Sequence, residues 1–181
     1  LLLQRELTGL NQAWVSDITF YQIDERFYFL TFIMDLYSRR IIGYSSSENL
    51  LTENTTLPAL KMAVAVRTLR SSLILHSDGG GQYYCKEFLQ LTRQHGIISS
   101  MAETVYENSN AERLNGLIKN DYLRHYGPSN YRALQKELTR AVRNYNAKPH
   151  SELNKLSPID FESKCGNMDY SQKNTTLQEL R

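Results

Sequence analysis

The chain has 181 residues, of which 41% are hydrophobic and 22% are charged, and its formal net charge is +2. This composition is ordinary for one globular domain, and no apolar run reaches the roughly 18 residues that cross a membrane. Three leucines at the start are followed by Gln4, Arg5 and Glu6, so we expect no signal peptide. Cys85 and Cys165 offer neither a disulfide framework nor a CxxC metal pair, which favours a reducing, cytoplasmic setting.

Hydrophobic periodicity predicts three strands followed by an alternation of helices and strands. The predicted strands span residues 13–21, 27–37, 41–47, 72–76 and 97–101. The predicted helices span residues 52–70, with Thr52 as N-cap, 82–95, 109–124 and a last segment that is capped by Ser129 or Asn130 and ended by Pro149. A polar loop is expected at 102–108. This order predicts an α/β fold with a five-stranded mixed sheet and helices on both faces.

Positive charge is concentrated in the C-terminal half. Residues 112–148 contain eight Lys or Arg and three acids, a net charge of +5 that leaves −3 for the rest of the chain. A basic segment of this kind favours a nucleic acid partner, although a solvated helix face would carry the same charges.

Two acids lie at positions that packing alone does not explain. Asp17 is inside the first strand among residues that should be buried, and Asp78 comes two residues after the strand at 72–76, just before three glycines. A buried carboxylate is costly unless it is paired or binds a metal. The structural alternatives are an edge-facing acid at Asp17 and a simple strand-to-helix turn at the glycines. The segment lacks the GK[ST] of a P-loop and the GxSxG of a serine hydrolase.

Glu112 is a third candidate acid, on the predicted helix 109–124. One face of that helix is apolar: Ala111, Leu114, Ile118 and Tyr122. Glu112, Asn115 or Gly116, and Lys119 share an adjacent face, which is also compatible with a surface ion pair. If the three acids met at the carboxyl ends of neighbouring strands, they would offer the oxygen ligands that two-metal phosphoryl chemistry needs.

Six segments, read together, resemble the catalytic core of the DDE transposases of bacterial insertion sequences, in the retroviral-integrase superfamily. They are WVSDITF (14–20), MDLYSRRIIGY (34–44), LHSDGGGQYY (75–84), HGIISSM (95–101), YENSNAERLNGLIK (106–119) and YNAKPHSELNKLSP (145–158). The resemblance covers residues 10–162 with the elements in the correct order. It implies a ribonuclease H-like fold, an integrase catalytic core at 13–162, an N-terminal extension at 1–12 and a flexible tail at 163–181.

The resemblance also implies roles for individual residues. Asp17, Asp78 and Glu112 match the catalytic, metal-binding acids, with 33 residues between the second and third acids where the family commonly has 35. We place the shortening in the loop 102–108. Lys119 matches a lysine that contacts the transposon end. The implied cofactor is Mg²⁺, for which Mn²⁺ would substitute, with two ions in the DNA-bound state.

Other residues are candidates for DNA contact or for structural roles. Asn115, Arg113 and Asn108 are candidate DNA contacts, and Asp35, His76 and His150 are expected to be structural. The resemblance implies DNA as the partner, at transposon ends and target sites, and a homodimer without a membrane association, in a bacterial cytoplasm near the nucleoid. A helix-turn-helix region normally precedes such a core and is absent from this sequence, so we expect weak DNA binding without sequence preference.

Two alternatives remain at this stage. A ribonuclease H-like nuclease would usually have a fourth carboxylate in the site, for which Asp35 is the only nearby candidate. An inactive DNA-binding or assembly module is the other alternative, and the presence of all three acids argues against it.

Overall fold

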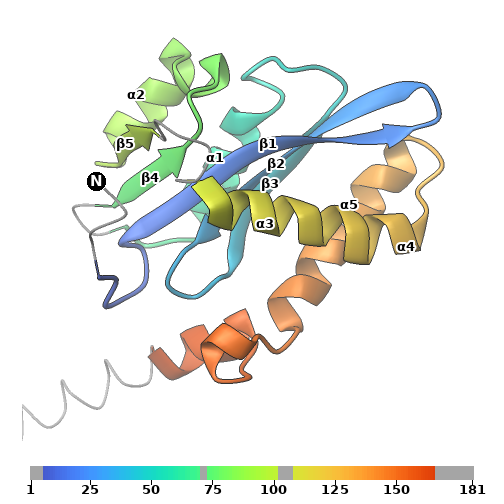
Figure 1. Ribbon diagram of the computed structural model, residues 1–181. Coiled ribbons are helices and arrows are strands. Elements are labelled where there is room, and N and C mark those ends of the chain that lie inside the picture. Colours follow the sequence, from blue (N-terminus) through green and yellow to red (C-terminus); the bar gives the residue numbers. More distant parts are fainter. Residues whose placement is uncertain (1–5, 70–72, 102–107, 166–181) are drawn as a thin grey trace, which may run out of the picture.

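The computed structural model describes residues 6–69, 73–101 and 108–165 and contains a five-stranded mixed sheet (Figure 1). The strands are arranged in the order β3-β2-β1-β4-β5. Their bounds are β1 Ala13–Ile23, β2 Arg26–Asp35, β3 Ile41–Ser47, β4 Ile74–Ser77 and β5 Ile98–Met101. The first three strands are antiparallel, whereas β4 runs parallel to β1 and β5 parallel to β4. The predicted meander and the predicted five-stranded mixed sheet are therefore confirmed.

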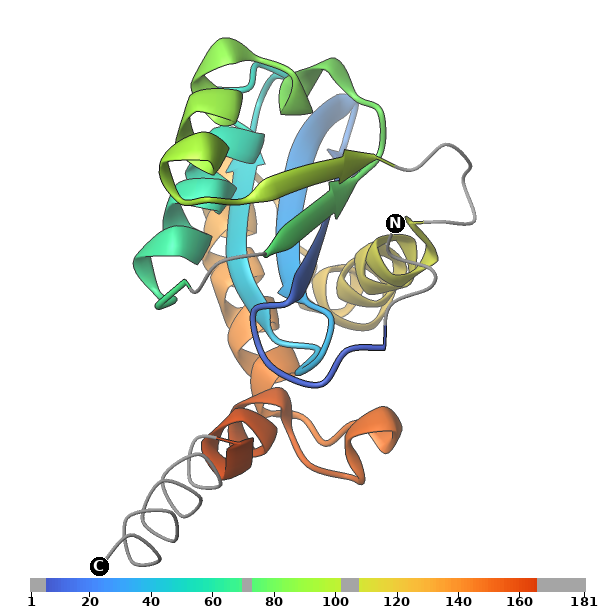
Figure 2. The ribbon, with the colours of Figure 1, turned by 90° about the vertical axis from the view of Figure 1, so that its left-hand side faces the viewer.

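Helices cover both faces of this sheet (Figure 2). One face packs on α1 (Thr56–Ala65), the 3₁₀ segment η1 (Gly81–Tyr83) and α2 (Lys86–Gln94), in a core that includes Trp14 and Phe88. The other face packs on α3 (Ser109–Leu117), the π-helical segment η3 (Ile118–Leu123) and α5 (Tyr131–Ala147). A short helix, α4 (Arg124–Tyr126), ends at Gly127, whose φ of 59° is in the left-handed region. Because alternate residues of a strand point to opposite faces, β1 contributes to both cores.

Helix α1 lies against β3 at a glycine. A Cβ built on Gly43 would lie 2.2 Å from the backbone oxygen of Ala59 in α1. Only a residue without a side chain permits this approach, which buries Ala59 and Ala63 completely. The prediction of a helix at 52–70 is correct in type, but the observed helix α1 is shorter at both ends and spans Thr56–Ala65. Pro58 explains the start, because a proline is tolerated in the first turn of a helix and not in its interior.

Two other predicted helices differ in their internal structure. The helix expected at 82–95 is divided, because Cys85 is extended and separates η1 from α2. The helix expected at 109–124 is continuous, but six of its residues form the π-helical segment η3. Asn130 caps α5 as predicted, since its side chain accepts a hydrogen bond from the backbone N–H of Ala133.

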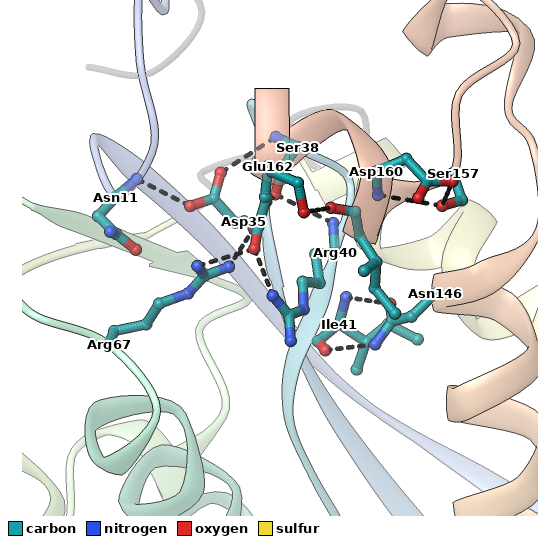
Figure 3. Close-up of polar contacts among 12 residues, drawn as sticks. Asn11, Asp35, Ser38, Arg40, Ile41, Arg67, Asn146, Ser157, Asp160 and Glu162 are labelled. Atoms are coloured by element: carbon teal, nitrogen blue, oxygen red, sulfur yellow. Dashed lines mark hydrogen bonds and ion pairs between the residues drawn. The ribbon is translucent and has the colours of Figure 1, made fainter. Parts of the chain in front are cut away.

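The C-terminal part of the described chain is held to the sheet by a buried ion-pair cluster (Figure 3). After the 3₁₀ segment η4 (Ser151–Leu153), residues 158–165 are helical and bring Glu162 beneath the turn between β2 and β3. The carboxylate of Glu162 pairs with Arg67 and Arg40 and accepts a hydrogen bond of 2.7 Å from Ser38 Oγ. Glu162 thereby joins the C-terminal helix, the segment after α1 and the β2–β3 turn. In the described residues no helix is both long and apolar enough to span a membrane.

We expect Gly43→Ala to lower the free energy of unfolding by about 1–3 kcal/mol, because the added methyl meets backbone rather than a movable side chain. Gly116→Ala is the matched control: a Cβ at Gly116 has no neighbour within 4 Å in the described structure, and alanine is the better helix former by ~1 kcal/mol. Denaturant unfolding of both variants should give opposite signs. Equal effects would contradict the close approach of α1.

We expect Glu162→Gln to lower the free energy of unfolding by about 3–5 kcal/mol, because the side chain of Arg67, 9% exposed, would lose its charge partner. Glu152→Gln, at an ion pair whose acid is 43% exposed, should change it by less than about 1 kcal/mol.

The same ion pair predicts a pH dependence. Burial alone would raise the pKa of Glu162, but hydrogen bonds from Arg67, Ser38 and Arg40 outweigh it and hold the pKa below the ordinary 4.5. The contribution of Glu162 is therefore complete above pH 4.5 and is lost as the pH falls through the lowered pKa. Urea unfolding between pH 7 and pH 3 should show a smaller loss of stability in Glu162→Gln than in the parent chain.

Candidate active site

The register of two parallel strands brings Asp17 and Asp78 together. Ser16 of β1 is paired with Ser77, the last residue of β4. Asp17 and Asp78 are the next residues of the two chains, and neighbouring strands lie about 4.8 Å apart. The two carboxyl groups therefore occupy adjacent positions where β4 ends, at the carboxyl end that the sequence predicts.

Helix α3, which carries Glu112, packs against β1 beside Asp17. The predicted apolar stripe is confirmed, since Ala111, Leu114, Ile118 and Tyr122 are all buried against the sheet. Two asparagines connect α3 to β1: Asn108 donates a hydrogen bond of 3.2 Å to the backbone oxygen of Ser16, and Asn115 donates one of 2.7 Å to Asp17 Oδ2. Glu112 lies on the helical turn between these two contacts, on the exposed side of the helix.

The pKa of Asp17 reflects its burial and both of the other acids. Burial and the neighbouring Asp78 carboxylate raise the pKa of Asp17 to about 7, and Glu112 adds to this effect. Hydrogen bonds from the backbone of Ile18 and from Asn115 act in the opposite direction but do not outweigh it. Like charges in close proximity disfavour the ionised form, so a cation placed among the carboxylates would relieve the repulsion.

Tyr83 supports the site from the opposite face of the sheet. Its hydroxyl lies 3.0 Å from Ser16 Oγ, and both residues are buried. Burial raises the pKa of Tyr83 well above its usual value. The hydrogen bond with Ser16 lowers this pKa, and the smaller effects of Asp17 and Asp78 raise it. Ser16 precedes one acid, and Tyr83 lies five residues after the other. Their contact therefore connects the two chain segments that carry the acids.

The glycines after Asp78 have different surroundings. Gly80 lies against the acid, since its N–H donates a 3.3 Å hydrogen bond to Asp78 Oδ1, and a Cβ there would lie 3.1 Å from that oxygen. Gly79 and Gly81 would place a Cβ in open space within the described structure. Gly79 and Gly81 thus add no side-chain bulk beside Asp78.

The four predicted DNA contacts have different environments. Lys119 and Arg113 have solvent-accessible charged ends: Lys119 Nζ lies 5.2 Å from the ring centre of Phe20, and Arg113 forms a 2.8 Å ion pair with Glu152. Asn108 and Asn115 are 3% and 5% exposed, and their amide groups hold β1. Asn115 was predicted from the helix face that it shares with Glu112, Lys119 from the resemblance, and Arg113 and Asn108 because they flank that face. None of these arguments gives the depth of a side chain.

The residues that were expected to be structural make contacts within the fold. Asp35 accepts hydrogen bonds from the backbone N–H groups of Asn11, Tyr37 and Ser38. His76 Nδ1 lies 3.2 Å from Ser100 Oγ on the neighbouring strand, and the ring of His150 packs edge-on against Tyr145. The supporting roles of Ser16, Tyr83 and Glu162 were missed. A tyrosine shortly after HSDGGG was visible in the sequence, but its partner 67 residues away was not.

No group of three or more His, Cys, Asp or Glu side chains within the described ranges is arranged to hold a metal ion as it stands. The donor set nevertheless suits a hard divalent cation, because it consists of carboxylate oxygens. Asn115 Oδ1 is buried without a described partner beside Asp17, which leaves an additional oxygen at the site.

Two matches to family models decide the classification. One model, described as an integrase core domain, matches residues 8–106, and a second model with the same description matches residues 96–158. The chain belongs to the integrase core domain family. The resemblance to insertion-sequence transposase cores that the sequence motifs indicated is thereby confirmed.

Individual relatives come from bacterial insertion sequences. The chain is 32% identical over 169 residues to the "insertion element IS600 uncharacterized 31 kDa protein" of Shigella sonnei, covering 89% of this chain and 60% of that protein. It is also 32% identical over 168 residues to the "transposase InsF for insertion sequence IS3A" of Escherichia coli K12, covering 87% of this chain and 56% of that protein. The integrase core domain described here thus spans little more than half the length of these relatives.

Solved structures confirm the ribonuclease H-like fold. The HTLV-2 integrase catalytic core domain, solved in complex with magnesium in a trimeric form, superposes with a TM-score of 0.68 at 21% identity, covering 83% of this chain and 95% of that one. The catalytic core domain of BIV integrase superposes with a TM-score of 0.64 at 16% identity, covering 88% and 99%.

We expect Tyr83→Phe to lower the free energy of unfolding by about 1–2 kcal/mol, because Ser16 Oγ would lose the buried hydroxyl that lies beside it while the packing of the ring is kept. Tyr84→Phe, at a side chain that is 47% exposed, is the neighbouring control and should have no measurable effect. Thermal and denaturant unfolding of the two variants test this difference, and an unchanged Tyr83→Phe variant would show that the contact contributes nothing.

Proposed function

We propose that this integrase core domain is the catalytic core of a transposase, which cleaves DNA at the ends of a transposable element and joins those ends to target DNA. The observation that carries the proposal is the strand register that sets Asp17 beside Asp78, with Glu112 close enough to raise the pKa of Asp17. The relative named transposase InsF and the retroviral integrase cores support the same chemistry.

Asp17, Asp78 and Glu112 act in this proposal as the DDE residues of a polynucleotidyl transferase and hold divalent magnesium, for which manganese would substitute. The HTLV-2 core was solved with magnesium, and the carboxylate donor set of this chain suits the same ion. When bound, two such ions supply an activated attacking oxygen and a stabilised leaving oxygen. No covalent enzyme intermediate is needed.

The chain's own residues then perform three tasks. Asn115 orients Asp17 through its 2.7 Å hydrogen bond, and the Ser16–Tyr83 contact keeps the segments carrying Asp17 and Asp78 in register. The open surface at Gly79 and Gly81 leaves room for the sugar-phosphate backbone. Lys119 and Arg113 contact DNA phosphates, whereas for Asn108 and Asn115 we now assign support of β1 in place of DNA contact.

A ribonuclease H-like nuclease is the less favoured function. Asp35, its candidate fourth carboxylate, is fully buried and engaged by three backbone N–H groups near the start of β1. Oligomerisation belongs to the same proposal: the HTLV-2 core was solved in dimeric and trimeric forms, and we expect a homodimer here.

We expect Asp78→Asn and Asp17→Asn each to abolish Mg²⁺- or Mn²⁺-dependent cleavage and strand transfer of DNA ends while the fold is retained. Each should also weaken Mn²⁺ binding by more than about 100-fold. Loss of a residue that only supports a metal ligand weakens metal affinity by about 100-fold at most. Calorimetric titration with Mn²⁺ and cleavage assays test this expectation, with Asp121→Asn, an exposed acid on η3, as the control. Unchanged cleavage or unchanged Mn²⁺ affinity in the Asp78 variant would reject its assigned role.

A further inference from the structure

Two phenylalanine rings are left in solvent beside the candidate active site. Phe20 on β1 is 54% exposed and Phe27 on β2 is 50% exposed. Their rings meet edge to face, with centroids 5.4 Å apart and an interplanar angle of 79°. The strand register pairs Phe20 with Phe29, so Phe20 and Phe27 lie on the same face of the β1–β2 hairpin. Large exposed apolar groups that cluster in this way often mark a binding surface.

The aromatic pair, Phe20 and Phe27, lies close to Asp17 along β1 but on the opposite face of the sheet. Phe20 follows Asp17 by three residues, which is about 10 Å along a strand. In the described structure β4 pairs with β1 over Ala13–Ser16, and the hairpin extends beyond β4 and β5 (Figure 1). Lys119, which projects from η3 on the other face of the sheet, reaches the Phe20 ring across this edge, with its Nζ 5.2 Å from the ring centre. Beyond Ser16, the edge of β1 that is not paired with β4 therefore allows a ligand to contact both faces of the sheet.

We propose that Phe20 and Phe27 form a stacking subsite for unpaired DNA bases next to the acidic triad. An aromatic ring offers every base the same π-face, so such a subsite binds without reading sequence. Only a base outside a duplex stack presents its own face, so the occupant is single-stranded. Lys119 Nζ lies over the Phe20 ring, where an ammonium is favourable, and its charge suits the phosphates of the same strand.

The size of the aromatic pair also favours a base over a protein. Two half-exposed phenylalanines offer roughly 200 Å². A stable protein interface needs about 800 Å² from each partner. A stacked base needs only a ring, and loss of one such ring typically weakens single-strand binding by roughly 5- to 150-fold. The inference rests on the proposed function because it places a DNA strand at the acids, but stacking can be measured without catalysis.

The test is equilibrium binding of the whole chain carrying Asp78→Asn to two DNA probes. One probe is a blunt duplex, and the other carries a short single-stranded overhang that contains 2-aminopurine. We expect tighter binding and quenched fluorescence with the overhang. Phe20→Ala and Phe27→Ala should each weaken overhang binding by roughly 5-fold or more and leave blunt binding within about 2-fold. Val66→Ala, at a side chain that is 59% exposed and lies at the end of α1, is the control and should change neither.

Further variants separate stacking from charge and from packing. Phe27→Tyr should restore overhang binding, and Phe27→Leu, which keeps apolar volume without a π-face, should not. Lys119→Ala should weaken both probes equally and reduce the salt dependence of binding by about one charge. The proposal is overturned if the phenylalanine variants affect both probes alike, if Phe27→Leu binds as the parent does, or if Phe27→Ala changes only the oligomeric state seen by light scattering. Failure of cleavage with overhang stacking intact would reject the proposed function and leave the subsite standing.

Discussion

The parallel pairing of β1 with β4 is the constraint on which the site depends. Two acids that are 61 positions apart in the sequence become neighbours because Ser16 and Ser77 are paired where β4 ends. A shift of the register by one residue would turn one carboxyl group to the opposite face of the sheet. Trp14 and Leu75, paired two residues earlier and almost completely buried in the same core, hold the register through packing. The hydrophobic core thus determines the distance between two polar groups.

That arrangement has an energetic cost, and the surroundings of Asp17 show how the integrase core domain tolerates it. Three carboxyl groups near one another repel, and burial adds a desolvation penalty. Hydrogen bonds from Asn115 and from the backbone of Ile18 offset only part of this, since the pKa of Asp17 remains at about 7. The Ser16–Tyr83 contact adds stiffness without adding charge. The carboxyl groups are therefore fixed in position, but the protein alone does not neutralise their negative charge.

Much of this arrangement follows from the sequence, and the failures have identifiable causes. The succession of strands and helices along the chain and the buried stripe of α3 follow from hydrophobic periodicity, which depends on neighbours close in the chain. The extended conformation at Cys85 and the π-helical segment η3 were missed because both depend on how the chain fits its tertiary surroundings. Asn115 was assigned to DNA because a helical wheel gives direction but not depth, and Asn108 because it flanks the same face in the sequence. Two further contacts, Ser16–Tyr83 and Arg67–Glu162, join residues that are 67 and 95 positions apart, and no local sequence pattern predicts such pairs.

Asp17 on β1 and Asp35 on β2, three positions apart in the register of these paired strands, have different electrostatic surroundings. Burial raises the pKa of Asp35 as it does that of Asp17. Asp35, however, is surrounded by three backbone donors and by the positive charge of Arg67, all of which favour its ionised form. The charged neighbours that act on Asp17 are Asp78 and Glu112, which disfavour it. A protein that needed Asp17 only for folding would gain by replacing it with a neutral residue, whereas Asp35 holds the β2–β3 turn in place. The acid whose charge the fold leaves uncompensated is the one that an external cation would complete.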